Sequence, residues 1–196
     1  MIAATMTIHL ASEPDEDSHL IARLARGDAD SFALFVNRFK DPVARLAHRL
    51  LGWNGDVDDI VQEVFLSVLQ KAPRFQGHCS LWTWLTVITL NRCRTWHRRQ
   101  RIWARVKQTL AGRRGAESEP VDRVPICEET ASQIRAAVAA LPQADREAVV
   151  LFYLEHRPVA EIGELIGASP NAVEVRLRRA RRKLRVSLRH LIEDEL

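Results

Sequence analysis

Cysteine is scarce in this chain of 196 residues, and the three that occur, Cys79, Cys93 and Cys127, lie far apart. An odd number at irregular spacing argues against a disulfide framework and is typical of a reducing compartment. There is no CxxC and no HExxH motif, so we expect no metal and no cofactor. A metal or redox role that pairs His78 with Cys79 is the alternative, and three ordinary thiols are the favoured interpretation.

Long apolar runs are also missing. No run approaches the ~20 apolar residues that span a bilayer, and the first twenty residues lack a basic leader followed by an apolar core. These absences predict a soluble, cytoplasmic protein without membrane insertion. The first dozen or so residues are expected to form a loose tail, and Met6 leaves the true start codon open.

Neither sign of charge dominates, because 29 Lys and Arg stand against 25 Asp and Glu, for a net charge of +4. Such a balance permits a nucleic-acid partner without requiring one. The distribution of charge is more informative, since basic side chains gather in residues 92–101 and 176–189. These two segments are the candidates for contact with nucleic acid.

Alternating strand patterns are nearly absent, whereas apolar residues recur with the helical period, which predicts an all-α fold. The stretch "GRRGAESEPVDRVPICEE" has two glycines, two prolines and no apolar period, and it indicates a linker. We therefore expect two small helical domains, residues 18–105 and 131–196, a flexible linker over 106–130 and a tail over 1–17. Within the first domain, Pro42 is expected to interrupt a helix or to open the next one.

An acidic cluster lies on the helix expected after the Asn54-Gly55 turn. Asp59, Gln62 and Glu63 share one face by i, i+3, i+4 spacing. The residues predicted to face the core are Ile60, Val64, Leu66, Ser67 and Val68.

The segment "SLWTWLTVITLNRCRTWHRRQRIW" holds four of the five tryptophans and runs into a cluster of arginines. Leu81, Trp84 and Ile88 lie on one apolar stripe, so Trp84 is predicted to be in the core. A second line from Trp82 to Trp96 is less apolar and leads to the arginines. Interleaved rings and cations suit opened nucleic acid, where a stacked base contributes ~1–3 kcal/mol. The alternative is a helix wedged between two others, with both lines buried.

The C-terminal third has the outline of a helix-turn-helix. Gly167 eases a sharp turn, Ser169 can cap a helix that Pro170 starts, and an apolar stripe from Val173 to Leu191 follows. The other faces of this helix are rich in arginine, where a recognition helix needs charge to enter the major groove. A solvated basic face is the alternative, and DNA binding is favoured.

Together these segments resemble the sigma-70 family of bacterial RNA polymerase sigma factors, in the extracytoplasmic function (ECF) group. The resemblance covers nearly all the chain and rests on motifs in the family's order and spacing: "GDADSFALFVNRF", "DVDDIVQEVFLSVL", "FQGHCSLWTWLTVITLNRCRTWHRR", "ALPQADREAVVLFYLE" and "VAEIGELIGASPNAVEVRLRRARRKL". It implies that the first domain is region 2 and the second is region 4. It also implies a promoter-specificity subunit of the polymerase without catalytic activity.

The resemblance assigns expected roles to residues of region 2. Binding of the beta-prime clamp of core polymerase falls to Asp59, Gln62 and Glu63. Capture and melting of the minus-10 element fall to Phe75, Gln76, Gly77, His78, Ser80, Trp82, Asn91, Arg94, Arg98 and Arg99. Base extrusion costs a few kcal/mol of stacking, which such a pocket must offset.

Region 4 is expected to read the minus-35 element and to contact the beta flap of the polymerase. The implied minus-35 residues are Ser169, Asn171, Glu174, Val175, Arg176, Arg178, Arg179 and Arg182. After Val173 the family usually has Lys or Arg and then Ser, so Glu174 and Val175 suggest an altered base preference. Gly163 stands where the family usually has alanine, and Thr95 where Asp is common.

The family further implies an anti-sigma factor as partner, membrane-linked, that masks both domains. The main rival function is a stand-alone helix-turn-helix regulator, which would bind duplex DNA without core polymerase. An enzyme is a distant third, because no nucleophile, base and orienting group come together by spacing.

Overall fold

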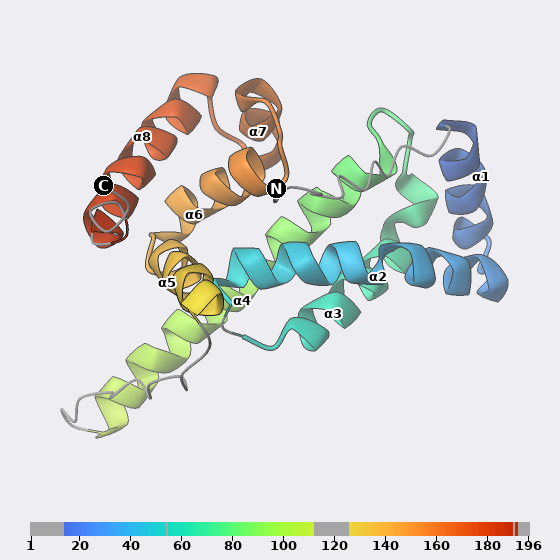
Figure 1. Cartoon of the computed structure of the whole chain (residues 1–196). Helices are drawn as coiled ribbons and strands as arrows, with labels where there is room; N and C mark the ends of the chain where they lie inside the picture. Colours follow the sequence, from blue (N-terminus) through green and yellow to red (C-terminus); the bar gives the residue numbers. More distant parts are fainter. Residues whose placement is uncertain (1–13, 54, 112–125, 190, 192–196) are drawn as a thin grey trace.

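The computed structural model describes residues 14–53, 55–111, 126–189 and 191. These residues confirm the predicted all-α fold, and none of the described residues forms a strand (Figure 1). The α-helices are α1 (Pro14–Ala25), α2 (Ala29–Leu51), α3 (Val57–Lys71), α4 (Leu81–Ala111), α5 (Ile126–Ala139), α6 (Gln143–Val149), α7 (Val159–Ile166) and α8 (Pro170–Ser187).

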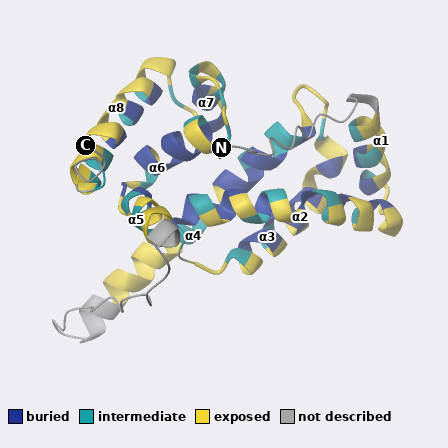
Figure 2. Ribbon diagram, viewed as in Figure 1, coloured by how far each residue is buried: buried dark blue, intermediate teal, exposed yellow. Residues whose placement is uncertain are grey.

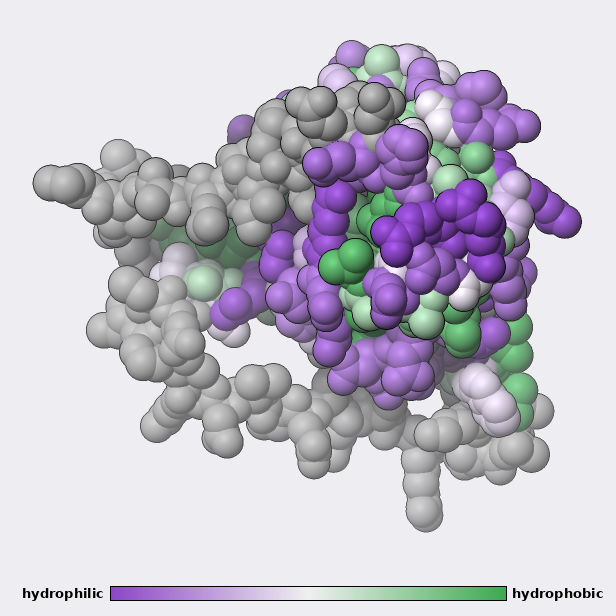
Figure 3. Space-filling view, turned by 90° about the vertical axis from the view of Figure 1, so that its right-hand side faces the viewer, coloured by the Kyte–Doolittle hydropathy of each residue, from purple (hydrophilic) through white to green (hydrophobic). Residues whose placement is uncertain are grey.

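The N-terminal unit is a bundle of α2, α3 and α4, with α1 packed at one end (Figures 1 and 2). Its most buried side chains include Phe35, Phe39, Ile60 and Leu85. The ring of Phe35 lies 4.9 Å from that of Phe39 and meets the ring of Phe65 edge-on at 5.8 Å. Figure 3 views the end of the molecule that carries α1, and its surface is mainly hydrophilic with small hydrophobic patches. The apolar side chains therefore mostly pack inside, where they hold α3 and α4 in place.

Helix α2 runs through Pro42 without a break, so the prediction that Pro42 ends or opens a helix was wrong. A proline inside a helix removes one backbone hydrogen bond and costs ~3 kcal/mol or more. Buried side chains on both sides of it, Phe39 before and Val43 and Leu46 after, anchor both halves in the core. Tertiary packing therefore outweighs the local cost.

The C-terminal unit contains the predicted helix-turn-helix, formed by α7 and α8. Gly167 adopts the left-handed conformation with φ 68°, and the Ser169 side chain accepts a hydrogen bond from the Ala172 amide at 3.2 Å. Val173 and Leu177 on α8 are buried against α6 and α7. A π-helical turn, Val150–Leu154, joins α6 to the segment before α7. The cap and the glycine turn fix the angle at which α8 leaves α7.

Gly163 is expected to be intolerant of alanine. A Cβ atom built at this position would lie 2.6 Å from the backbone oxygen of Ala168, so the turn between α7 and α8 would have to shift. Overpacking of this kind costs about 1–3 kcal/mol. We expect Gly163→Ala to lower the midpoint of urea denaturation, followed by circular dichroism. Gly27→Ala is a poor control because of its positive φ, whereas Ala160→Ser on the exposed side of α7 should leave the midpoint unchanged. An unchanged midpoint for Gly163→Ala would contradict the tight contact.

The two units lie side by side (Figure 1), and a buried arginine joins them. Arg146 on α6 is 6% exposed. Its guanidinium donates to the backbone oxygens of Leu50 at 3.0 Å, Ala139 at 2.7 Å and Leu141 at 3.3 Å, and to His97 Nε2 at 2.9 Å. Leu50 belongs to α2 and His97 to α4, so this side chain joins α6 to the N-terminal bundle.

The helix ends differ from the predicted boundaries in two places. Helix α1 begins at Pro14, inside the predicted tail of residues 1–17. Helix α4 continues to Ala111 and α5 begins at Ile126, so both ends of the predicted linker, 106–130, are helical. Residues 1–13 and 112–125, which carry most of the predicted tail and linker, lie outside the described residues.

Candidate polymerase and nucleic-acid interface

The acidic face of α3 lies at the surface. Asp56 caps this helix by accepting a hydrogen bond from the Asp59 amide at 3.3 Å. Asp59 and Gln62 are exposed, and Glu63 is half-buried. Glu63 is also engaged by the arginine cluster, because Arg99 of α4 approaches it at 3.0 Å.

Leu66 lies on this same surface, so the prediction that it faces the core was wrong. It is 59% exposed, whereas its neighbour Ser67 is buried. The Ser67 hydroxyl donates to the Glu63 carbonyl at 2.6 Å and accepts from Arg92 at 2.9 Å, which satisfies it inside the protein. Leu69 is also partly exposed, so the acidic cluster continues into an apolar strip.

The loop before α4 presents its predicted residues to solvent. Gln76, Gly77, His78 and Ser80 are exposed, and the ring of His78 is hydrogen-bonded to the Gln76 side chain at 3.0 Å. Ser80 caps α4 by accepting from the Thr83 amide at 3.1 Å. This cap starts α4 at the end of the loop, so the loop and the helix form one continuous surface.

Both tryptophan lines of α4 are largely buried, as in the alternative in which this helix is wedged between two others, and Leu81, Leu85 and Ile88 of the predicted core line are buried. Trp84 is only half-buried and lies against Phe75, with ring centroids 5.0 Å apart. On the line from Trp82 to Trp96, Thr86 and Thr89 are buried, as is Cys93. That line therefore faces the core, and the Trp82 ring is itself half-buried rather than free for stacking.

Buried threonines explain why that line looked polar. The Thr86 hydroxyl donates to the Trp82 carbonyl at 2.8 Å, and the Thr89 hydroxyl donates to the Leu85 carbonyl at 2.8 Å. Each hydroxyl is satisfied within its own helix, so burial costs little. Gly55 supports the far end of the line, because a Cβ there would lie 3.0 Å from the Trp96 ring.

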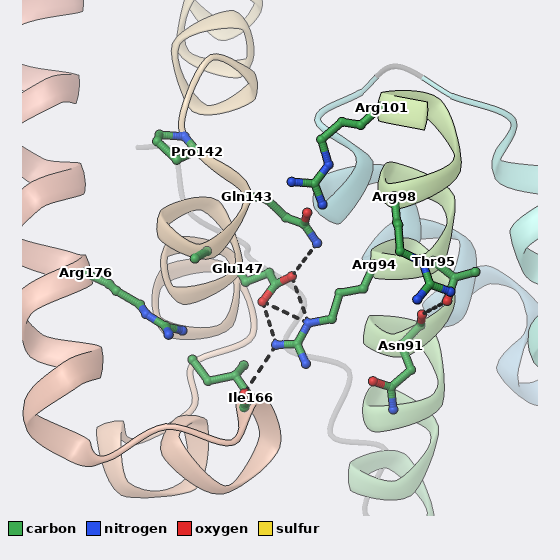
Figure 4. A pocket seen from close by; sticks show the side chains of 11 residues that line it. Asn91, Arg94, Thr95, Arg98, Arg101, Pro142, Gln143, Glu147, Ile166 and Arg176 are labelled. Carbon is green, nitrogen blue, oxygen red and sulfur yellow. Dashed lines mark hydrogen bonds and ion pairs between the residues drawn. The ribbon is translucent and has the colours of Figure 1, made fainter. Parts of the chain in front are cut away.

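Some of the arginines towards the end of α4 form ion pairs, and others are exposed with no ion pair to any described residue. Arg94 forms a two-pronged ion pair with Glu147 of α6, with the shortest contact at 2.7 Å (Figure 4). This hydrogen-bonded carboxylate raises the pKa of Arg94, in spite of partial burial. Arg98 and Asn91 are exposed, and neither forms an ion pair among the described residues. The predicted minus-10 arginine Arg94 is thus occupied by the C-terminal unit.

The predicted minus-35 residues lie on two different faces of α8. One face is exposed and carries Asn171, Glu174, Val175, Arg178 and Arg182. The other face is turned towards α6 and carries the remaining two arginines. Of these, Arg179 lies 3.1 Å from the buried carboxylate of Asp145, which Lys183 also approaches at 3.5 Å.

Arg176, on that inner face, lines a pocket between the two units (Figure 4). Ser169 serves as the cap of α8. Both carboxylate oxygens of Asp145 are buried and lack a well-aligned hydrogen bond to the described residues. The buried negative charge therefore depends on the two nearby cations for compensation. Replacing either cation leaves a buried charge less compensated.

Sequence reasoning missed the charged residues of α6. Asp145, Arg146 and Glu147 are all buried, and Glu155 after the π-helical turn pairs with Arg49 of α2 at 2.8 Å. Burial raises the pKa of Glu155, and the nearby Arg49 opposes that effect. Their main partners lie on other helices, far away in sequence, so the local signal was limited to three adjacent charges in a short helix.

His97 is held neutral by its surroundings. Burial is the main cause that lowers its pKa, and Arg146 and Arg101 add to it, while the Leu50 carbonyl and Glu147 oppose it. Arg146 donates to Nε2 at 2.9 Å, which requires a free lone pair on that nitrogen. The neutral ring is therefore part of the contact between the two units.

His97 should make stability fall in mild acid. Because its pKa is lowered in the folded protein, stability is present above the ordinary histidine value of about 6.5 and is lost as the pH falls below it. We expect the urea midpoint to decrease between about pH 7.5 and 5.5. His97→Gln keeps an acceptor for Arg146 and should flatten this dependence, whereas His19→Gln, at an exposed position on α1, should leave it unchanged. Equal pH profiles for the three proteins would contradict this role.

Both cysteines with described side chains, Cys79 and Cys93, have raised thiol pKa values. Burial is the main cause that raises the pKa of Cys93 to about 12, so its thiol stays protonated. Cys79 is exposed, and desolvation raises its pKa too. The side chain of Cys127 lies outside the described residues. Among the side chains that can be described, no three His, Cys, Asp or Glu residues gather as metal ligands.

Comparison with known proteins agrees with this architecture. The family model for Sigma-70 region 2 matches residues 35–102, and that for Sigma-70, region 4 matches residues 131–184. The chain is 31% identical over 180 residues to the RNA polymerase sigma factor NccH of Alcaligenes xylosoxydans xylosoxydans, covering 88% of this chain and 95% of NccH. It is 28% identical over 179 residues to the ECF RNA polymerase sigma factor SigW of Bacillus subtilis, covering 87% and 96%.

Solved structures resemble it as well. CnrH in complex with the cytosolic domain of CnrY matches with a TM-score of 0.62 and 26% identity, covering 89% of this chain and 97% of CnrH. The sigma factor RpoE in complex with the anti-sigma factor NepR from Bartonella quintana shares the fold, with a TM-score of 0.65 at 20% identity over 82% of this chain and 98% of RpoE.

The chain therefore belongs to the sigma-70 family. Within that family it is an ECF sigma factor, which directs RNA polymerase to promoters and to the initiation of transcription. None of the helices in the described ranges has the length and apolar content to cross a membrane.

Proposed function

We propose that this ECF sigma factor reads the minus-35 element through the outer face of α8. The observation that carries the proposal is the exposed row of Asn171, Glu174, Val175, Arg178 and Arg182, in which neither arginine has an ion-pair partner among the described residues. An exposed row at the start of a capped helix is the surface that a helix-turn-helix inserts into the major groove. The two arginines would contact phosphates, and Glu174 with Val175 would contact base edges.

We further propose that α3 binds the beta-prime clamp of core polymerase, and that region 4 contacts the beta flap. The exposed carboxylate of Asp59 beside Gln62 supports the first part, since complementary charge sets encounter rate and register. The exposed side chain of Leu66 adds apolar area to the same face. The protein would act as a subunit without catalytic activity, in the bacterial cytoplasm.

The minus-10 element would meet the loop of residues 75–80 and the exposed side of α4. Phe75 and Trp84 offer an aromatic pair beside the loop, and Asn91, Arg98 and Arg99 follow along the helix. Arg94 can join them only when its ion pair with Glu147 opens. Trp82 is half-buried against the core, as are Phe75 and Trp84.

Reconstitution with core polymerase tests the function directly. A gel shift with promoter DNA should show tight binding only when core polymerase is present, and run-off sequencing with the holoenzyme should yield both promoter elements. A stand-alone regulator would instead bind the duplex equally well without core polymerase.

Glu174 should determine part of the minus-35 preference. A carboxylate can accept a hydrogen bond from cytosine N4, and a good base contact contributes about 1–3 kcal/mol of discrimination. We expect Glu174→Lys to change the selected minus-35 bases in a promoter library while leaving the fold intact, because the side chain is exposed. Glu164→Lys, an exposed glutamate on α7, is the charge-matched control. Unchanged promoter choice would sink this assignment.

An anti-sigma factor is the partner we propose for control, and we infer that it is membrane-linked. Support comes from CnrH and RpoE, whose structures were solved with CnrY and with NepR. Co-expression of this chain with a candidate inhibitor should yield a stable complex that no longer binds core polymerase. A candidate that binds without blocking core polymerase would contradict this form of control.

A further inference from the structure

A cavity of about 680 Å³ lies between the two units, and its lining is strongly basic (Figure 4). Helix α4 contributes Arg94, Arg98 and Arg101, and α8 contributes Arg176 from the opposite side. Glu147 is the single carboxylate among the lining residues. The volume is within the range of about 300–1,000 Å³ that small-molecule sites occupy.

The one carboxylate that lines the cavity already has hydrogen-bond partners within the protein. Glu147 binds Arg94 at 2.7 Å and accepts from the Gln143 amide at 3.0 Å. Arg98, Arg101 and Arg176 have no carboxylate partner in the described parts of the chain, so three positive charges face the cavity without compensation. Arginine stays protonated at any physiological pH, so a bound anion would compensate these three charges directly.

We propose that this cavity binds a small polyphosphate anion, either free or as the phosphate chain of a nucleotide. A guanidinium offers a planar fork that matches a phosphate oxygen pair, and three forks from two sides call for more than one phosphate group. The amides of Asn91 and Gln143 add uncharged polar groups, and Ile166 adds apolar surface. A monovalent anion would satisfy only part of this charge.

The anion would also hold the two units together. Arg98 and Arg101 belong to the N-terminal unit and Arg176 to the C-terminal unit, so one ligand bridges both. The cavity exists only while the units are packed, and a ligand stabilises the state to which it binds. The effect on promoter DNA rests on the proposed function: Arg98, and Arg94 once its ion pair opens, are proposed promoter contacts, so anion and promoter should compete.

Calorimetry on the full chain tests the site. Tripolyphosphate and adenosine triphosphate, each without magnesium, are titrated at constant ionic strength, with sulfate as a third titrant. We expect both polyphosphates to bind at one site at least tenfold more tightly than sulfate. Tighter binding of adenosine triphosphate than of tripolyphosphate would identify the phosphate chain of a nucleotide as the ligand. Equal affinities would identify a free polyphosphate. Equal affinity for sulfate would overturn the proposal.

Variants separate the cavity from general basic charge. Arg101→Ala with Arg176→Ala should weaken polyphosphate binding at least tenfold, and both side chains can be removed without opening the core. Arg26→Ala with Arg185→Ala removes one exposed arginine from each unit outside the cavity and should bind as the wild type does. Circular dichroism verifies that both double variants are folded. Equal weakening in the two would overturn the site.

Solution scattering and transcription complete the test. Tripolyphosphate should decrease the radius of gyration of the wild type or leave it unchanged. An increase would contradict the proposal that the anion holds the two units together. Run-off transcription with core polymerase is measured on the same preparation. If the protein supports transcription but does not bind polyphosphate, the anion site is rejected and the proposed function stands. If it binds polyphosphate but does not support transcription, the anion site stands and the proposed function is rejected.

Discussion

Replacing Arg146 by methionine should separate the two units and lower the free energy of unfolding by about 3 kcal/mol or more. The guanidinium of Arg146 is buried and donates to three backbone oxygens and to His97. Each buried acceptor that loses its partner costs about 1–3 kcal/mol. Methionine fills similar volume without a donor, so the loss reflects hydrogen bonds rather than a cavity.

Two measurements check this result. Urea denaturation should show a lower midpoint, and solution scattering should show a larger radius of gyration. Arg135→Met is the matched control, because Arg135 lies exposed on α5 and should change neither quantity. A variant at position 146 that stays as compact and as stable as the control would show that Arg146 does not join the units.

Reversing the charge of Asp59 should nearly abolish binding to core polymerase while the fold survives. Asp59 is exposed in the first turn of α3, and its side chain has no partner among the described residues. If this face meets a basic surface, a lysine there brings like charges together at a cost of several kcal/mol. We expect Asp59→Lys to weaken binding by a factor of about one hundred, measured by fluorescence anisotropy with labelled protein.

Asp58→Lys provides a closely matched control. Asp58 is the neighbouring residue, also exposed in the same first turn, but it points about 100° away around the helix. Both variants lose the same favourable interaction with the helix dipole, so their stabilities should fall alike. If both lose core binding equally, the acidic face is not the specific contact.

Local features of α8 were predictable because their causes are local. Ser169, Pro170 and Gly167 act on backbone atoms a few residues away, and the apolar spacing from Val173 onwards needs only the helical period. The same reasoning failed at Pro42, where buried residues on both sides outweigh the local preference. It failed again at Thr86 and Thr89, since a hydroxyl bonded to its own helix can be buried as readily as an apolar side chain.

The candidate site was predicted in part. Spacing placed Asp59 and Gln62 on one exposed face, and the structure has them so. The resemblance to sigma factors supplied the arginines of α4 and α8, but it treated each set as one surface. Arg94 pairs with Glu147 and Arg179 pairs with Asp145, so among the described residues each set is divided into paired and unpaired arginines. Each pair joins two helices, so the periodicity of a single helix cannot predict it.

The sequence by itself determined that this protein is all-helical, that it ends in a helix-turn-helix and that it is related to the sigma factors. Those conclusions follow from periodicity, capping and motif order, which act over a few residues. Only the tertiary structure decided which arginines are free. That outcome depends on how α6 packs between α2, α4 and α8, where partners 53 residues apart in sequence, Arg94 and Glu147, come within 2.7 Å.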